Sequence, residues 1–195
     1  MSREKHFSWA VFTGLVLLFS GANLNAEEML LIDDRQNDGI QSTIGSPWRL
    51  ITDSVMGGVS DGSLSPESID GKSCLRLRGT VQLENSGGFI QAALDIGQTP
   101  ASNASDYQGL MLEVYGNDER YNVHLRTDDV WLPWQSYRAS FQAPARWHKV
   151  ELPFEAFTAY RIGKKLDIEH LRRIGIVAIG REFTADLCIG KLALY

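Results

Sequence analysis

Hydrophobic and polar residues alternate along much of the chain. In CLRLRG, Leu75 and Leu77 point to one side and Arg76 and Arg78 to the other. The same alternation recurs in GLMLEVYG, RYNVHLRT and WQSYRASF, and WHKVELP, IGIVAIG and ADLCIGKLALY are further strand-like segments. A period of two indicates strands with one buried and one exposed face. The residues predicted to face the core are Leu75, Leu77, Leu110, Leu112, Val114, Tyr121, Val123, Leu125, Tyr137, Ala139 and Phe141.

Turn-forming sequences such as DGS, ENSGG, YGNDERY and QAPARW separate these segments. Helical signal is scarce. LDIEHLRR (166–173) predicts a turn or two of helix, and PFEAF (153–157) predicts a short 3-10 piece. A series of about ten strands with few helices favours a sandwich or barrel over a βαβ fold. The predicted fold class is therefore all-β, a two-sheet jelly-roll β-sandwich.

The N-terminal segment does not share this pattern. Arg3 and Lys5 precede the mostly apolar stretch FSWAVFTGLVLLFSG, which is followed by small residues. This arrangement is typical of a secretory signal peptide. We expect a signal peptide over 1–26, cleaved after Ala26 rather than Ala22, and one β-sandwich domain over 27–195. An uncleaved anchor is the alternative, although the apolar stretch is short for a membrane span.

Composition narrows the class of partner. The chain has 195 residues, a length that suits one domain. Hydrophobic residues make up 44% and charged residues 22%, and the formal net charge is −5. A negative protein is a poor match for nucleic acid or an anionic membrane. We expect neither as a partner, and no membrane span after cleavage.

Two cysteines, Cys74 and Cys188, lie in strand-like segments. An oxidising compartment would permit a disulfide between them, and two buried thiols are the alternative. No histidine lies at zinc-ligand spacing from either cysteine. Calcium at Asp33, Asp34 and Asp186 is conceivable because first and last strands often pair. Calcium needs six or more oxygen ligands, however, so we predict no metal and no cofactor.

The sequence GVSDG, Gly58 to Gly62, matches the G-x-S-x-G pattern of a hydrolase nucleophile elbow. That chemistry needs a buried strand before the serine and a helix after it. The following residues, Ser63 to Pro66, lack helical periodicity, and Pro66 disfavours helix at the preceding residue. A serine hydrolase acting through Ser60 is a minor alternative. The expectation is a glycine-rich loop that leads into a strand, in a protein that is not an enzyme.

An ordered set of segments resembles a known family. WRLITDSVMGGVSDGSL is similar to the N-terminal signature of the complex I intermediate-associated protein 30 family. The resemblance continues through SGGFIQAAL, SDYQGLMLEVYGNDERYNVHLRT, WQSYRASF and WHKVELPFEAF with RIGKK, and ends in LDIEHLRRIGIVAIGREFTADLCIGKLALY. It covers about residues 28–195. The family usually has Pro before Arg-Gly after PFEAF, whereas this chain has Tyr160-Arg161-Ile162-Gly163.

This resemblance implies a galactose-binding-like jelly-roll sandwich and a non-catalytic role, since the mitochondrial namesake assists the assembly of respiratory complex I as a chaperone. The predicted leader is secretory and lacks the character of a transit peptide. We therefore expect an exported bacterial member, periplasmic or secreted, and we carry over from the family a non-catalytic binding domain rather than the complex I role.

The polar faces of the predicted strands suggest where a ligand binds. They carry Met111, Glu113 and Tyr115 on one strand, Asn122, His124 and Arg126 on the next, and Trp134, Ser136 and Arg138 on a third, with Trp131 nearby. Aromatic faces stack on sugar rings and planar donors bind hydroxyls, while Trp, Tyr and Arg also dominate protein interfaces. Packing under loops is the alternative for these residues, and Trp48 and Trp147 are expected to be structural. The predicted ligand-binding residues are His124, Arg126, Trp131, Trp134 and Arg138.

Two binding functions remain open from the sequence. The first is a non-catalytic binding or assembly factor that acts on an extracytoplasmic protein partner. The second is a carbohydrate-binding module that uses the aromatic and arginine face. In both cases the domain holds a partner, protein or glycan, without transforming it.

Overall fold

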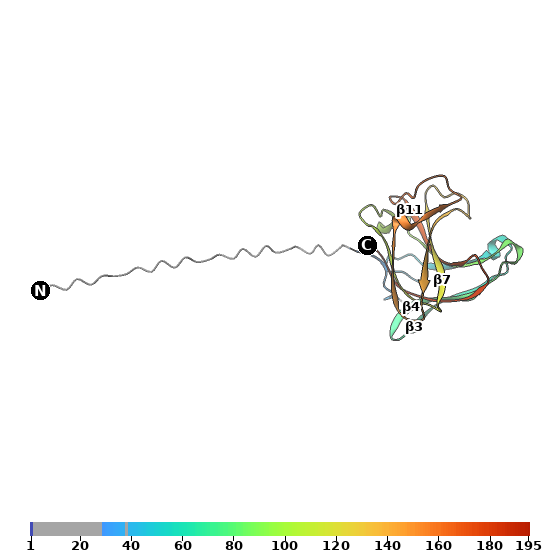
Figure 1. Ribbon diagram of the computed structural model, residues 1–195, viewed down its shortest axis with the longest axis horizontal. Helices are drawn as coiled ribbons and strands as arrows, with labels where there is room; N and C mark the ends of the chain where they lie inside the picture. Colours follow the sequence, from blue (N-terminus) through green and yellow to red (C-terminus); the bar gives the residue numbers. More distant parts are fainter. Residues whose placement is uncertain (2–28, 38) are drawn as a thin grey trace.

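Two antiparallel sheets pack face to face in the computed structural model, which describes Met1, residues 29–37 and residues 39–195 (Figure 1). The first sheet has the order β3 (Asp61–Ile69), β4 (Lys72–Val81), β12 (Phe183–Leu194), β6 (Gly109–Tyr115) and β9 (His148–Pro153), and β1 (Leu30–Asp33) also pairs with β12. The second sheet has the order β10 (Thr158–Tyr160), β8 (Ser136–Ala143), β7 (Glu119–Thr127), β11 (Leu171–Ile179), β5 (Phe89–Asp95) and β2 (Trp48–Thr52). Four short 3-10 segments connect them: η1 (Asp53–Met56), η2 (Glu84–Ser86), η3 (Pro100–Ser102) and η4 (Phe154–Ala156).

The all-β two-sheet fold is thus confirmed. Apart from Met1, the predicted signal peptide lies outside the described residues. Within the part of the chain that is described, no helix has the length and apolar character needed to cross a membrane.

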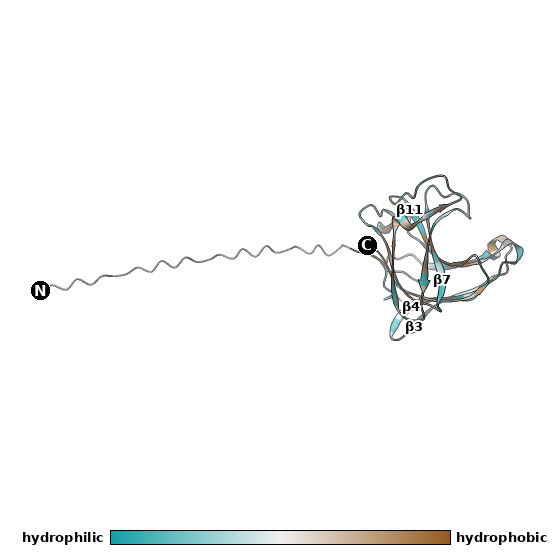
Figure 2. Cartoon of the chain, in the orientation of Figure 1, coloured by the Kyte–Doolittle hydropathy of each residue, from teal (hydrophilic) through white to brown (hydrophobic). Residues whose placement is uncertain are grey.

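Alternation along the strands builds the core between the sheets. Every residue predicted to face inward is buried, from Leu75 on β4 to Phe141 on β8. Figure 2 shows hydrophobic and hydrophilic residues interleaved along the strands. Trp48 is fully buried, and its indole Nε1 donates to Asp33 Oδ2 at 2.7 Å, so its polar atom is satisfied inside the core.

Helix was predicted wrongly at 166–173. Residues 166–170 form a loop, and β11 begins at Leu171. Packing decides this segment, because its last residues continue into the buried run of β11 between β7 and β5. The short 3-10 piece in PFEAF is present as η4. Pro66 lies on β3, an edge strand, where a missing amide hydrogen is tolerated.

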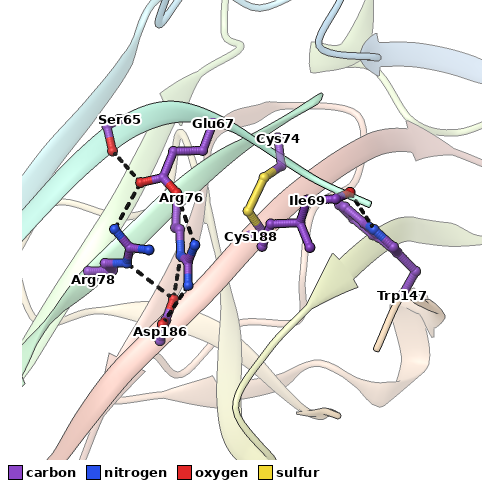
Figure 3. Close-up of a disulfide and its surroundings, with 9 residues drawn as sticks. All are labelled: Ser65, Glu67, Ile69, Cys74, Arg76, Arg78, Trp147, Asp186 and Cys188. Carbon is purple, nitrogen blue, oxygen red and sulfur yellow. Dashed lines mark hydrogen bonds and ion pairs between the residues drawn. A yellow bond between two sulfur atoms is a disulfide. The ribbon is translucent and has the colours of Figure 1, made fainter. Parts of the chain in front are cut away.

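Cys74 and Cys188 are joined by a disulfide in this structure (Figure 3). They lie on the adjacent strands β4 and β12, with Cα atoms 5.4 Å apart, and both are buried. Trp147 lies nearby and donates its indole N–H to the carbonyl of Ile69 at 3.1 Å. The bond ties together strands separated by 114 positions in the sequence.

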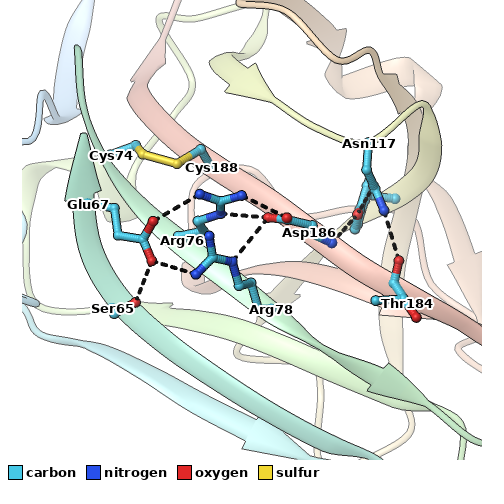
Figure 4. Close-up of polar contacts among 10 residues, drawn as sticks. Ser65, Glu67, Cys74, Arg76, Arg78, Asn117, Thr184, Asp186 and Cys188 are labelled. Carbon is cyan, nitrogen blue, oxygen red and sulfur yellow. Dashed lines mark hydrogen bonds and ion pairs between the residues drawn. A yellow bond between two sulfur atoms is a disulfide. The ribbon is translucent and has the colours of Figure 1, made fainter. Parts of the chain in front are cut away.

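The outward face of the first sheet carries a closed network of charges (Figure 4). Arg76 contacts both oxygens of Asp186, at 2.6 and 2.7 Å, and Glu67 at 2.9 Å. Arg78 contacts Glu67 at 2.9 Å and lies 3.6 Å from Asp186. Hydrogen bonding to Arg76 is the main cause that lowers the pKa of Asp186. Two cations and two anions balance one another here, so this network needs no outside ligand.

Candidate ligand-binding face

A groove of about 330 Å³ opens over the outward face of the second sheet. Its floor comes from alternate residues of β8, β7, β11 and β5, whose other residues fill the core. One wall comes from the β7–β8 loop and β10, and the other from η1 and the loop after η2. The η1 and η2 segments form the tip that projects to the right in Figure 1.

Four of the five predicted ligand-binding residues line this groove: His124, Arg126, Trp134 and Arg138. His124 and Arg126 lie on β7, and Arg138 lies directly opposite His124 on β8. Trp134 precedes β8 rather than lying within it. These residues converge because β7 and β8 are neighbours in one sheet.

Trp131 and the β6 residues lie elsewhere. The Trp131 side chain is 85% exposed on the β7–β8 loop and is not part of the groove lining. Met111, Glu113 and Tyr115 were grouped with the β7 and β8 faces, but β6 belongs to the first sheet. That grouping was wrong, because alternation shows which residues share a face of one strand and not which strands share a sheet.

An aromatic wall stands at the β10 side of the groove. The Arg138 guanidinium carbon lies 3.5 Å from the ring centroid of Tyr160, a cation–π contact. Arg138 Nε also donates to the Ser136 hydroxyl at 2.9 Å. Trp134 is 45% exposed and Tyr160 38% exposed, and the Arg138 guanidinium covers one face of the Tyr160 ring. A planar apolar surface beside fixed donors is what a sugar ring needs.

Arg126 braces the β7–β8 loop. Its guanidinium donates to the carbonyl of Pro133 at 3.1 Å and to that of Leu132 at 3.3 Å. These bonds fix the loop that carries Trp134, so Arg126 positions the wall as well as lining the groove.

His124 forms part of the floor as a neutral imidazole. Burial, together with the charges of Arg138 and Arg126, lowers its pKa to about 3. Its Nε2 atom is buried and has no hydrogen-bond partner. The residue opposite it on β11 is Gly175, where a Cβ would lie 2.7 Å from the Gln91 side chain. The absence of a side chain there leaves room for Gln91 over the floor.

The opposite wall is held by a buried aspartate, Asp53. Its carboxylate accepts hydrogen bonds from the amide of Ser60 at 3.0 Å, from the Ser60 hydroxyl and from the amides of Gly88 and Phe89. Burial acts to raise the pKa of Asp53, but these hydrogen bonds outweigh it and the pKa lies below its ordinary value. The carboxylate therefore ties η1 to the Gly87–Phe89 segment, and both line the groove.

Glycine is required around this carboxylate. A Cβ on Gly58 would lie 2.4 Å from Asp53 Cγ, and one on Gly87 would lie 2.4 Å from Asp53 Oδ2. Real Cβ atoms do not approach so closely. Gly58 of DSVMGGVSDG and Gly87 of SGGF thus pack around one anion.

Ser60 belongs to the group of hydrogen bonds around the Asp53 carboxylate, which we call the Asp53 anchor, and is not an exposed nucleophile. It is 6% exposed, its hydroxyl donates to Asp53, and its oxygen accepts from the amide of Gln82 at 3.0 Å. Strand β3 begins at Asp61, where an elbow would need a helix. The geometry therefore opposes acyl transfer at Ser60.

The three candidate calcium ligands do not converge. Asp33 pairs with Arg35 at 2.8 Å, Asp34 accepts from the Thr43 hydroxyl at 2.8 Å, and Asp186 pairs with Arg76. Among the residues that the structure describes, no group of three or more His, Cys, Asp or Glu side chains could hold a metal ion.

Several lining residues were missed from the sequence. They are Val55, Met56, Phe89, Gln91, Tyr160 and Arg173. Alternation in FIQAALD and RRIGIVAI puts Gln91 and Arg173 on the outward faces of their strands. It assigns them to this site only once β5 and β11 are known to lie in the same sheet as β7. Tyr160 lies on a three-residue edge strand, which is too short to show alternation.

The fold is a jelly-roll β-sandwich of the kind seen in carbohydrate-binding modules. A family 11 carbohydrate-binding module from Clostridium thermocellum, in complex with a β-1,3-1,4-mixed-linked tetrasaccharide, aligns with a TM-score of 0.65 at 12% identity over 85% of this chain and 94% of that one. A family 30 module of a cellulosomal cellulase from the same organism aligns with a TM-score of 0.55 at 13% identity, over 86% and 97%. At this identity the likeness concerns the fold.

The chain belongs to the complex I intermediate-associated protein 30 family, whose model matches residues 35–189. That match spans both sheets and the Asp53 anchor. A search of curated proteins found no match.

Proposed function

We propose that this protein is a non-catalytic binding module that holds an oligosaccharide in the groove on its second sheet. The observation that carries the proposal is the aromatic wall of Trp134 and Tyr160 beside planar and amide donors on the floor. Aromatic faces take up the C–H surfaces of a sugar ring while Arg138 and Gln91 bind its hydroxyls. A volume of about 330 Å³ lies within the range of small-ligand sites.

The states of His124 and Ser60 favour binding over turnover. His124 is neutral and buried, and the Ser60 hydroxyl donates its hydrogen bond to Asp53. The fold likeness to carbohydrate-binding modules supports the same choice, since the family 11 module is described in complex with a tetrasaccharide. The Cys74–Cys188 disulfide supports a site of action outside the cytoplasm, periplasmic or secreted.

A glycan array tests this function, with Trp134→Ala as the site variant and Trp131→Ala as its matched control. Both substitutions remove an exposed indole from the same loop, but only Trp134 lines the groove. Loss of a stacking surface should weaken binding at least about tenfold in Trp134→Ala and leave Trp131→Ala near wild type. Equal losses in the two variants would place binding at the loop tip instead. No glycan bound by the wild type would refute the function.

A second candidate is an assembly factor that binds an extracytoplasmic protein. The observation that favours it is a set of exposed apolar side chains on the two walls, Val55 and Met56 on η1 and Trp131 and Leu132 on the β7–β8 loop. Such residues suit a protein hot spot. Trp131→Ala separates the candidates, because a protein partner that covers the walls would lose affinity in this variant and a sugar in the groove would not.

A further inference from the structure

Positive charge gathers around the groove without matching negative charge. Four arginines line it, Arg126, Arg138, Arg161 and Arg173, and its lining contains no Asp or Glu. The whole chain has a formal net charge of −5. The groove is therefore positively charged, whereas the protein as a whole is negatively charged.

Strand pairing brings three of these cations close together. Arg138, Arg126 and Arg173 lie on the adjacent strands β8, β7 and β11. Arg126 and Arg173 are directly opposite in the β7–β11 register. Like charges at opposed positions destabilise a sheet. Asp95 pairs with Arg173 at 2.5 Å, but Asp95 is also the partner of Arg49.

The other sheet shows how this fold balances outward arginines. Arg76 and Arg78 share Glu67 and Asp186 on neighbouring strands. In the groove, the hydrogen bonds of Arg126 and Arg138 go to neutral acceptors: the carbonyls of Leu132, Pro133 and Trp134 and the hydroxyl of Ser136.

The pKa values of both groove arginines reflect this environment. Burial is the main cause that lowers the pKa of Arg126, with Arg173 and Arg172 adding to the effect. Burial likewise lowers the pKa of Arg138, and Arg161 adds to it. A bound anion would offset the cost of burying the charges of Arg126 and Arg138 and the repulsion from the neighbouring arginines. His124 is neutral, so it adds no competing charge.

We infer that the groove binds an acidic oligosaccharide, with a uronate carboxylate held between Arg126 and Arg138 and the sugar ring against Trp134 and Tyr160. A planar carboxylate matches the paired N–H donors of a guanidinium. This inference rests on the proposed sugar-binding function. A second hollow of about 570 Å³ shares Arg126 and Arg173 with the groove, but its lining also includes Asp95 and Asp128, so we place the uronate in the groove and not in this hollow.

Affinity electrophoresis of the purified protein tests this inference. The gels contain polygalacturonate, its carboxyl-reduced neutral polymer, dextran sulfate, dextran or mixed-linked β-glucan. Because the protein is acidic overall, non-specific attraction to a polyanion is disfavoured. Arg138→Gln is the site variant. Arg120→Gln is the matched control, since Arg120 lies on the same face of β7 as Arg126 but about 20 Å along the strand and outside the lining.

The expected result is retardation by polygalacturonate that disappears after carboxyl reduction and falls when salt is raised. Arg138→Gln should weaken this binding at least about tenfold and Arg120→Gln should not, because a charge-assisted bond is lost only in the first. Thermal melts establish that both variants are folded.

Four results would overturn the inference. Retardation by dextran sulfate but not by polygalacturonate would assign the arginines to sulfate esters. Retardation by β-glucan that Trp134→Ala abolishes, with none by polygalacturonate, would leave the proposed function standing and remove its acidic ligand. Equal retardation of both arginine variants by polygalacturonate would place the anion elsewhere. No retardation in any gel would remove the proposed function as well.

Discussion

At the scale of single residues, the buried carboxylate of Asp53 explains why glycine is needed at Gly58 in the most recognisable motif of the chain. Its oxygens accept from Ser60, Gly88 and Phe89, and Gly58 lies too close for any side chain. A buried anion with several donors is costly to disturb, because the donors would be left unpaired. The motif is therefore structural, and it shapes the groove by fixing one wall.

Gly58→Ala tests this packing. A Cβ that overlaps Asp53 should lower the free energy of unfolding by about 1–3 kcal/mol, the usual cost of overpacking. Gly163→Ala is the control, because Gly163 has open space around its Cβ position and should change stability by less than about 0.5 kcal/mol. Urea denaturation measures both. Equal stability of the two variants would contradict the close approach at Gly58.

His124 predicts a pH dependence of stability. The unfolded chain takes up a proton at His124 near the ordinary pKa of 6.5, whereas in the folded protein the pKa is about 3. Stability from this group is therefore complete above 6.5 and falls as pH drops from 6.5 toward 3. His124→Gln, which cannot titrate, should lose about 2–3 kcal/mol less than wild type between about pH 7 and about pH 4.5. Urea titrations at the two pH values measure this, and parallel losses would show that His124 protonates freely in the fold.

At the scale of elements, the disulfide joins β4 to β12, and β12 is the strand to which β1, β4 and β6 all pair. Closing a loop of 114 residues restricts the unfolded chain strongly. The double variant Cys74→Ala/Cys188→Ala should therefore lose about 3–5 kcal/mol of unfolding free energy. Urea denaturation with and without reductant measures this. Reductant should destabilise the wild type and leave the double variant unchanged, and two reactive thiols in the unreduced, denatured protein would contradict the bond.

Elements also show where prediction from the sequence succeeds. Period-two alternation placed Leu75, Tyr121 and Phe141 in the core, because one face of each strand must be buried. It could not show that β6 pairs with β12 while β7 pairs with β8 and β11, since pairing depends on long-range packing. Residues such as Arg173 and Tyr160 enter the site through that pairing alone.

At the scale of the whole molecule, the outward faces of the two sheets differ in character. The first sheet carries the disulfide and a balanced charge network, and the second carries an open groove lined by four arginines and by exposed aromatic residues. A face that exposes aromatic side chains beside arginines, with no acidic residue in the groove lining, is more consistent with binding than with structural support.

The central claim, that a sugar occupies the groove on the second sheet, is tested most directly by the tryptophan indole signals in a ¹H–¹⁵N NMR titration. The probes are trigalacturonate, cellotetraose and a mixed-linked β-glucan tetrasaccharide. We predict that at least one probe shifts the Trp134 indole signal, while those of Trp48 in the core and Trp147 on the other sheet stay in place. A shift of Trp147 without Trp134, or no shift with any probe, would contradict this account.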